Sequence, residues 1–387
     1  MQERLPLIDY MANLFEQEVL ENCALIGVQH LLGSTHLMFE ALIQKGLKPN
    51  KVALIGKCYS TCPQTLKKMS ERGMFVSPSS IQFDSHQSYD DLFEEYLFSF
   101  LKQQFEAIQK QSKRLIILDD GGALIHMIAT HFSDKINIPM IGIEQTSSGY
   151  NILKSNKISF PIINIARSNL KLKHETPFIV EALENQIYSA LKDFQGNILI
   201  IGKGIIGTSL FEKLSNKKFK VQAIDKKEFS DPDTYYDELK KGISKASCII
   251  GCTGTTSIPE HFHKYIKKDC ILISASSTDR EFDSVHIRKH EPQTTICHKH
   301  IKTSNKTLMN SGFPVNFTGE THSVAPEKIQ LTRALIMGAI YQALYSQNHS
   351  SGLIDLDESI QDNIYNNFQK FLKNGEKNVT VSNSLYC

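Results

Sequence analysis

The sequence lacks the features that mark membrane-spanning, exported or disulfide-stapled proteins. It contains no apolar run of about 18 residues, the length that a membrane-spanning helix needs. Residues 1–19 carry charges where a signal peptide needs an apolar core, and the eight cysteines are too few for a disulfide framework in a chain of 387 residues. These absences favour a cytoplasmic protein with no membrane partner.

An excess of charge of either sign is also missing. The chain has 43 Lys and Arg against 41 Asp and Glu, a formal net charge of +2. Because nucleic-acid-binding surfaces are strongly basic, no nucleic-acid partner is expected. Cys58 and Cys62, and the Cys-His-Lys-His stretch at 297–300, lack a second pair of ligands at zinc-site spacing, so no metal site is expected.

Short, almost entirely apolar runs alternate with helical patterns along most of the chain. Such runs are typical of parallel strands covered by helices on both faces. The alternation predicts an α/β protein built from doubly wound parallel sheets. The expected strands are 51–56, 115–119, 139–143, 160–165, 197–201, 220–224, 248–251 and 270–274, and the clearest helices are 32–43, 91–108, 178–193 and 326–346. Residues 375–387 are polar and show no periodicity.

One glycine pattern follows a predicted strand and opens a predicted helix. It comprises Gly202, Gly204 and Gly207, with Ile205 and Ile206 between the last two. In a dinucleotide-binding turn the first glycine permits the turn, the second admits the pyrophosphate and the third lets helix pack on strand, while the helix N-terminus attracts the phosphates. The next strand ends at Asp225, a spacing that suits an acid on the ribose hydroxyls and favours NAD over NADP.

A second turn of small residues, at Thr253 and Gly254, follows the strand 248–251. In a Rossmann domain the other half of the dinucleotide lies at this position. Both turns could instead serve only to join strand and helix in a domain that binds nothing. The strand–turn–helix context and the position of Asp225 favour bound NAD over that alternative.

Further segments, collinear along most of the chain, resemble the S-adenosylhomocysteine hydrolase family. The most specific are LDDGG at 118–122 and EQTSSG at 144–149, which resemble the LDDGG and EETTTG segments of that family. The others are GVQH at 27–30, KCYST at 57–61, PIIN at 161–164, KLKHE at 171–175, CTG at 252–254 and GFPVN at 312–316.

The resemblance implies that a Rossmann NAD domain is inserted into a discontinuous substrate domain. Residues 1–180 would begin the substrate domain, 181–322 would form the NAD domain, and 323–387 would contribute a return helix and a tail. It also implies tightly bound NAD that oxidises the 3′-hydroxyl of a 5′-thio-nucleoside, so that the acidified C4′ hydrogen leaves and the 5′ thioether is eliminated and hydrolysed. The family forms tetramers, which suggests a homo-oligomer here, a dimer or tetramer.

Residue by residue, the resemblance makes Lys171 the base at the 3′-hydroxyl and places Asp120 near C4′. It makes His30 the residue that transfers protons at the 5′ leaving group or the water. The other implied site residues are Glu175 beside the lysine; Thr146, Ser147, Ser148 and Asn316 at the cofactor; and Ser60, Thr61, Gln145 and His322 around the substrate. Considered alone, Asp120 could belong to a strand-ending turn, His30 could be a core residue and Lys171 could be solvated.

The departures from the family concern proton transfer. Gln145 replaces an acid and cannot take up a proton, and Ser277 stands where the family has a histidine. The basic, tyrosine-rich tail of the family has no counterpart in the final VTVSNSLYC. Three functions therefore stay open: the full hydrolase, an NAD-dependent oxidoreductase or lyase that performs part of the cycle on a related nucleoside, and a non-catalytic NAD-binding regulatory homologue.

Overall fold

The computed structural model describes residues 5–110, 112–276, 278–346 and 350–383, with side chains described as far as Lys373. The chain divides into two compact units. The first comprises the described residues up to 81, 94–175 and those from 324 onward; the second comprises 82–93 and 176–323. The sequence-based boundaries lie at 180 and 322 and count 82–93 with the first domain.

The first unit is built on a seven-stranded sheet with the order β13-β6-β5-β4-β1-β2-β3. The strands are β1 (Cys23–Gln29), β2 (Val52–Gly56), β3 (Phe75–Val76), β4 (Arg114–Asp119), β5 (Met140–Glu144), β6 (Pro161–Asn164) and β13 (Gly352–Asp355). Every neighbouring pair is parallel, so the carboxyl ends of all strands share one edge. The chain order reverses between β4 and β1, the kind of switch point at which such sheets bind ligands.

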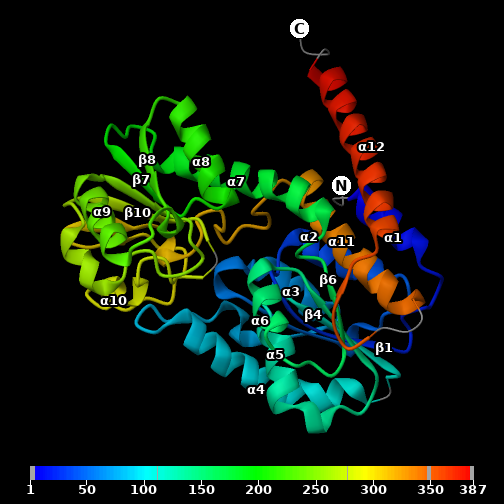
Figure 1. Ribbon diagram of the computed structural model, residues 1–387. Helices are drawn as coiled ribbons and strands as arrows, with labels where there is room; N and C mark the ends of the chain where they lie inside the picture. The colour runs from blue at the N-terminus through cyan, green and yellow to red at the C-terminus, as the bar shows by residue number, and fades with distance from the viewer. Residues whose placement is uncertain (1–4, 111, 277, 347–349, 384–387) are drawn as a thin grey trace. The chain divides into compact units, whose positions relative to one another are not determined.

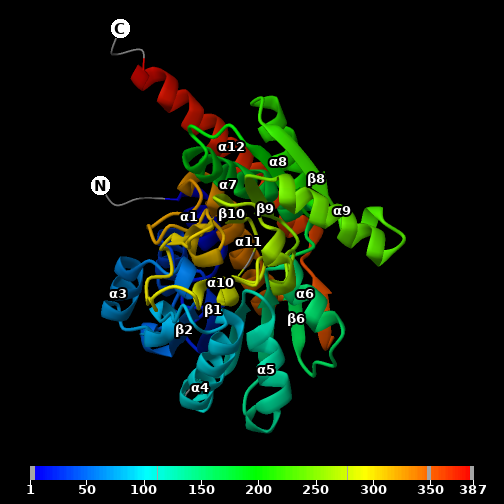
Figure 2. The same ribbon diagram turned by 90° about the vertical axis from the view of Figure 1, so that its left-hand side faces the viewer.

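Helix α11 occupies the interior of the first unit and packs against α1, α2 and α12 (Figures 1 and 2). Its residues 330–340 are all buried, which brings Thr332 and Arg333 inside the unit. The helices that belong to this unit are α1 (Pro6–Leu14), α2 (Gly33–Ile43), α3 (Pro63–Glu71), most of α4 (Tyr89–Gln109), α5 (Ala123–His131), α6 (Ser147–Lys154), α11 (Pro326–Tyr345) and α12 (Glu358–Asn383). Helix α12 continues into the stretch from 375 that has no helical pattern.

Strand β1 was not predicted from the sequence, although it lies next to β4 at the centre of the sheet. All seven of its residues are buried. A Cβ on Gly27 would lie 3.1 Å from the carbonyl oxygen of Leu118, so glycine allows close packing against β4. Because glycine weakens a strand pattern, Gly27 also explains why this strand was not predicted from the sequence. Strands β3, β11, β12 and β13 were not predicted either.

The second unit has a six-stranded sheet with the order β11-β12-β10-β9-β7-β8, parallel except for β11. Its strands are β7 (Asn197–Ile201), β8 (Lys220–Ile224), β9 (Cys248–Gly251), β10 (Cys270–Ser274), β11 (Ile301–Lys302) and β12 (Lys306–Leu308), and its helices are α7 (Thr176–Ala190), α8 (Ile205–Asn216), α9 (Pro232–Lys245) and α10 (Ser284–Arg288). The chain order reverses between β7 and β9.

Strand β7 shows why the unit is doubly wound. Its residues Ile198 and Ile200 pack in one core with α7 and α8, while Leu199 and Ile201 pack in the other with α9. Both faces of the strand are therefore apolar and covered, as the continuous NILII run indicated. The predicted α/β class, with two mostly parallel sheets, is confirmed.

Arg288 connects the segment 82–93 to the rest of the second unit through hydrogen bonds. Its side chain is fully buried and donates to the backbone oxygens of Ser85, Gln87 and Ser311 at 2.7–2.9 Å. It also pairs with Asp279 at 2.6 Å. With all three guanidinium nitrogens hydrogen-bonded, this buried charge is compensated.

No helix in the described part of the chain is both long enough and apolar enough to cross a membrane.

Candidate functional site

The three glycines of the turn after β7 meet different steric surroundings. At Gly202, φ is +101° and a Cβ would lie 2.8 Å from the backbone of Cys252, so a side chain is excluded. A Cβ on Gly207 would lie 1.9 Å from the oxygen of Gly202, which shows how closely α8 packs on the turn. A Cβ on Gly204 would meet no atom within 4 Å. The turn thus leaves open space at the position where backbone approaches a pyrophosphate.

The first turn of α8 is open to a ligand. No side chain caps its N-terminus at Gly204, so the N–H groups of the first turn are not satisfied by a capping side chain. Ile205 is 61% exposed and Ile206 is half-buried. A helix N-terminus with free donors and a positive dipole end suits a phosphate group.

Asp225 follows β8 and lies beside the glycine turn. Its Oδ2 accepts from the backbone N–H of Lys203 at 2.6 Å and its Oδ1 from that of Lys227 at 2.9 Å. Burial would raise the pKa of Asp225, but these two hydrogen bonds and the lysine charges lower it. The ionised carboxylate has lone pairs left for further donors such as ribose hydroxyls.

Glu281 holds the turn after β9. Its Oε1 accepts from the backbone N–H groups of Thr253 and Gly254, both at 2.7 Å, and its Oε2 accepts from the Thr253 hydroxyl at 2.9 Å. Glu281 is fully buried, and burial raises its pKa. The sequence singled out the turn, whereas the carboxylate that shapes it comes from 28 positions further along the chain.

The remaining predicted residues of the second unit lie in its later loops. Asn316 is buried, His322 is half-buried in the segment before α11, and Ser277 lies outside the residues that the structure describes. His298 and His300 each bond to Asn310. Within the described residues no three His, Cys, Asp or Glu side chains are grouped so that they could hold a metal ion.

In the first unit, the carboxyl ends of β1, β2 and β4 bring His30, Lys57 and Asp120 together at the switch point. Lys57 Nζ pairs with Asp120 Oδ1, and His30 Nε2 lies 3.4 Å from Asp120 Oδ2. The side chains of Lys57 and Asp120 are only 10% and 8% exposed. The predicted residues His30 and Asp120 are therefore neighbours, although 90 positions separate them in the sequence.

Burial and charge set the protonation of this group. Burial would raise the pKa of Asp120, but His30 and the Lys57 cation hold it well below its usual range. Burial would lower the pKa of Lys57, but the Asp120 carboxylate raises it above its usual value. For His30, burial and the Lys57 cation outweigh the attraction of Asp120 and lower its pKa to about 4. At neutral pH the group contains a carboxylate, an ammonium and a neutral imidazole.

Three predicted substrate residues surround the same group. The Ser60 hydroxyl bonds His30 Nδ1, and the Thr61 hydroxyl donates to the backbone oxygen of Lys57 at 2.9 Å. Gln145 Nε2 donates to Asp120 Oδ2 at 2.7 Å. A glutamate at 145 would set a second carboxyl against Asp120, whereas the amide stabilises the carboxylate as a hydrogen-bond donor.

Lys171 and Glu175 lie on a single π-helical turn (Lys171–Glu175) that precedes α7. Lys171 Nζ contacts Glu175 Oε2 at 2.8 Å, and the Thr332 hydroxyl donates to Glu175 Oε1. The charge of Lys171 acts on both Asp120 and His30, so the turn belongs to the same electrostatic group. Single π-helical turns are frequent at functional sites.

Behind Asp120 lies a second pair of acids, Asp119 and Glu144, which are directly opposite in the β4–β5 register and fully buried. Glu144 Oε1 accepts from the N–H and hydroxyl of Thr146 at 2.6 and 2.7 Å. Among the described residues, Asp119 Oδ1 and Glu144 Oε2 have no hydrogen-bond partner. Burial raises the pKa of Asp119 to about 7 and that of Glu144 above its usual value.

Thr146 also caps α6, because its hydroxyl accepts from the N–H of Gly149 at 2.9 Å. Ser147 and Ser148 form the first turn of that helix. A Cβ on Gly149 would lie 2.3 Å from Glu144, so this turn packs directly on the buried acid. The predicted cofactor residues Thr146, Ser147 and Ser148 are thus positioned by Glu144.

The buried acid pair predicts that the free energy of unfolding falls as pH rises. Because the pKa of Asp119 is about 7 in the folded protein and about 4 when unfolded, the folded state binds more protons between these values and stability falls as pH rises. In Asp119→Asn the amide oxygen still accepts from Ile125 N–H, but this titration is lost. We expect urea unfolding at pH values from about 5 to about 8 to show that the free energy of unfolding of the variant rises relative to that of wild type. The rise should be on the order of 1 kcal/mol per pH unit. Parallel stability curves would contradict the assignment.

Sequence reasoning missed three residues of the first-unit group: Lys57, Thr332 and Arg333. Lys57 stood in the KCYST segment, and a lysine directly after a buried strand was the available signal. Thr332 and Arg333 lie on α11 and carry no local signal, because only packing brings them to Glu175 and Asp120.

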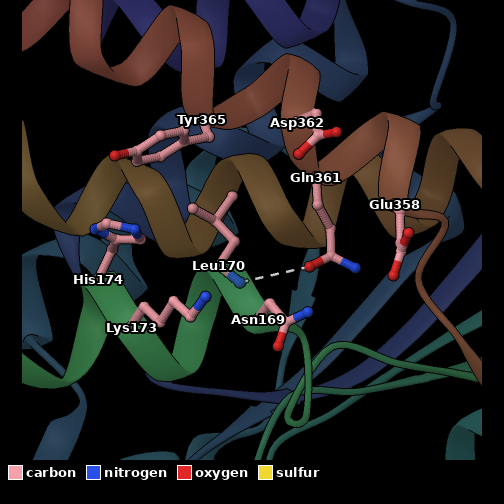
Figure 3. A pocket seen from close by; sticks show the side chains of 8 residues that line it. All are labelled: Asn169, Leu170, Lys173, His174, Glu358, Gln361, Asp362 and Tyr365. Atoms are coloured by element: carbon pink, nitrogen blue, oxygen red, sulfur yellow. Dashed lines mark hydrogen bonds between the residues drawn. The ribbon is translucent and has the colours of Figure 1, made fainter.

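A pocket of about 330 Å³ opens elsewhere in the first unit, between the π-helical turn and α12. Figure 3 shows its eight lining side chains, among them Lys173 and His174 on one side and Asp362 and Tyr365 on the other. Between these two sides, the Leu170 N–H donates to Gln361 Oε1 at 3.4 Å. None of the eight belongs to the Asp120 group.

Comparison with known proteins identifies relatives without a known function. Two uncharacterised proteins of Mycobacterium tuberculosis, from strains CDC 1551 / Oshkosh and ATCC 25618 / H37Rv, are each 36% identical over 350 residues, covering 87% of this chain and 68% of the relative. The chain belongs to the family of these mycobacterial proteins. No family model matches the sequence.

Solved structures resemble the fold only loosely. A dipicolinate synthase subunit from Bacillus halodurans has a TM-score of 0.38 at 11% identity, covering 86% of this chain and 100% of that one. The Bacillus subtilis protein has 0.39 at 10%, covering 86% and 97%. An NAD-complexed D-isomer specific 2-hydroxyacid dehydrogenase from Lactobacillus delbrueckii ssp. bulgaricus has 0.33 at 12%, covering 66% and 96%. Likeness at this level says nothing about chemistry.

Proposed function

We propose that the protein is an NAD-dependent enzyme that oxidises a ribose hydroxyl of a nucleoside substrate, in the manner of S-adenosylhomocysteine hydrolases. The observation that carries this proposal is the group formed by His30, Lys57, Asp120, Lys171 and Glu175 at the switch point of the first sheet. The open glycine turn and Asp225 in the second unit supply a dinucleotide-binding site. Buried, charge-coupled polar groups at a switch point are typical of an active site.

The cofactor residues have separate tasks in this proposal. The N–H groups at the start of α8 bind the pyrophosphate, and Asp225 accepts from the ribose hydroxyls. Thr253 and Gly254, held by Glu281, line the other half of the dinucleotide together with Asn316. When bound, NAD accepts a hydride from the sugar carbon and returns it at the end of the cycle.

The residues of the first unit hold the nucleoside and move protons. Lys171 takes the proton of the 3′-hydroxyl as the C3′–H bond breaks, and Glu175 orients that lysine. The resulting ketone acidifies the C4′ hydrogen, and the Asp120 carboxylate accepts that proton. The C5′–S bond then breaks with its electron pair on sulfur. His30, with Ser60 on its other nitrogen, handles protons at the 5′ position.

One feature favours a partial cycle as a second candidate function. A His30 pKa of about 4 leaves the imidazole neutral at neutral pH, so it has no acidic proton ready for the departing thiolate. Gln145 adds a hydrogen bond but no proton. An oxidoreductase or lyase that stops before hydration is therefore the alternative, and a regulatory NAD-binding protein is the third possibility.

The proposed oxidation predicts reduction of bound NAD by nucleosides. Adding adenosine or S-adenosylhomocysteine to the NAD-loaded protein should raise the absorbance of NADH. Lys171→Ala should slow that rise by roughly 10²–10⁴-fold, because a positioned proton acceptor is lost. Lys173→Ala is the matched control on the same π-helical turn, since Lys173 is exposed and outside the Asp120 group.

The outcomes separate the three functions. Free homocysteine released from S-adenosylhomocysteine indicates the full hydrolase, whereas NADH without homocysteine indicates the partial cycle. Binding of NAD and nucleoside with no NADH signal would overturn the enzymatic proposal and leave the regulatory one. A nucleoside substrate, a homo-oligomeric state, and the lack of nucleic-acid and membrane partners remain predictions.

A further inference from the structure

Arg333 is a buried cation whose hydrogen bonds are incomplete. Its side chain is only 3% exposed, and its Nε donates to the Ser34 hydroxyl at 3.2 Å. Among the described residues, neither terminal nitrogen makes a hydrogen bond or ion pair. By contrast, the buried Arg288 uses all three nitrogens. The difference marks the two terminal nitrogens of Arg333 as donors without a partner among the described residues.

Arg333 lies within the electrostatic group around Asp120. Burial lowers its pKa to about 10, while the carboxylates of Asp120 and Glu175 act in the opposite direction. The side chain therefore stays charged at neutral pH. Neither carboxylate is in ion-pair contact with it, because Asp120 is bound by Lys57 and Glu175 by Lys171.

The two carboxylates nearest in charge to Arg333 are already paired with other residues. Asp120 pairs with Lys57 and Glu175 with Lys171, so neither is left to form an ion pair with the guanidinium. Among the described residues, the fully buried polar atoms without a partner do not include the terminal nitrogens of Arg333, which therefore keep some accessible surface. An anion bound there would compensate the guanidinium charge. The planar fork of a guanidinium matches the paired oxygens of a carboxylate or phosphate.

We propose that Arg333 binds an anionic group of the substrate, a carboxylate or a phosphate, through its two terminal nitrogens. This inference deepens the proposed function, on which it rests for the nucleoside part of the ligand. Arg333 is then the residue that selects nucleosides with a carboxylate-bearing or phosphate-bearing substituent over neutral nucleosides. Nothing in the residues from 328 to 338 of the sequence signals this role.

The test compares adenosine, adenosine 5′-monophosphate and S-adenosylhomocysteine by isothermal titration calorimetry on the full-length protein. Wild type should bind either adenosine 5′-monophosphate, which carries a phosphate, or S-adenosylhomocysteine, which carries a carboxylate, roughly 10- to 100-fold more tightly than adenosine. In Arg333→Met that preference should disappear, so that the variant binds all three ligands with similar affinity. Arg333→Lys keeps the charge but loses the fork, so it should keep part of the preference. Which ligand gains identifies phosphate or carboxylate as the recognised group.

A readout without nucleoside separates this inference from the proposed function. Inorganic phosphate or acetate, compared with chloride at equal ionic strength, should raise the melting temperature of wild type but not of Arg333→Met. If the anions stabilise wild type only and no nucleoside binds, the proposed function is wrong but the anion site at Arg333 is supported. Equal anion effects in both proteins, or none in either, would overturn the role of Arg333.

Discussion

Replacing Gly207 by alanine is expected to lower NAD affinity by at least about 100-fold and to destabilise the second unit by on the order of 3 kcal/mol. The new Cβ would lie 1.9 Å from the oxygen of Gly202, a backbone atom that no side-chain rotation can move away. Helix α8 must therefore shift from the turn after β7, and its N–H groups move from the phosphate position. Thermal unfolding and calorimetric titration with NAD measure the two effects.

Gly204→Ala is the matched control, because it changes the same turn without a clash. Its Cβ would meet no atom within 4 Å, and a φ of −69° is open to alanine. Stability should stay the same or rise slightly, since alanine restricts the unfolded chain. NAD binding should still weaken, because the methyl group fills the space for the pyrophosphate. Undiminished NAD binding by Gly204→Ala would show that this turn is not the cofactor site.

Replacing Lys57 by methionine is expected to lower the free energy of unfolding by about 3–5 kcal/mol. The change leaves the Asp120 carboxylate, 8% exposed, without the cation that compensates it. His30 and Gln145 still contact Asp120 but carry no full positive charge at neutral pH. Urea unfolding of the variant and wild type at neutral pH measures the loss.

A double-mutant cycle separates this ion pair from simple loss of packing. Lys57→Met combined with Asp120→Asn should cost much less than the sum of the two single changes, because neither partner is then left as an unpaired buried charge. Lys48→Met is the surface control: Lys48 and Glu21 are about half exposed, and that pair should contribute at most about 1 kcal/mol. Additive effects of Lys57→Met and Asp120→Asn would mean that the two charges are not coupled.

The group around Asp120 could be predicted only in part. His30, Asp120, Lys171 and Glu175 were found through segments that resemble a known family, and the structure places all four within one electrostatic group. Lys57 was part of one such segment, yet nothing in the sequence paired it with Asp120. The protonation state of His30 could not be predicted either, because its pKa depends on burial and on cations from the loop after β2, the π-helical turn and α11.

The features that could be predicted from the amino-acid order are local ones. The α/β class followed from the periods of apolar residues, and the glycine turn with Asp225 followed from spacing within one strand–turn–helix–strand segment, where steric rules act between near neighbours. Folding in three dimensions was needed to set the strand order that puts β1 beside β4, the contact of Thr332 with Glu175 across 157 positions, and the burial of Arg333. The physical reason is that burial and electrostatic coupling depend on distance in space, which packing sets and a pattern in the chain does not record.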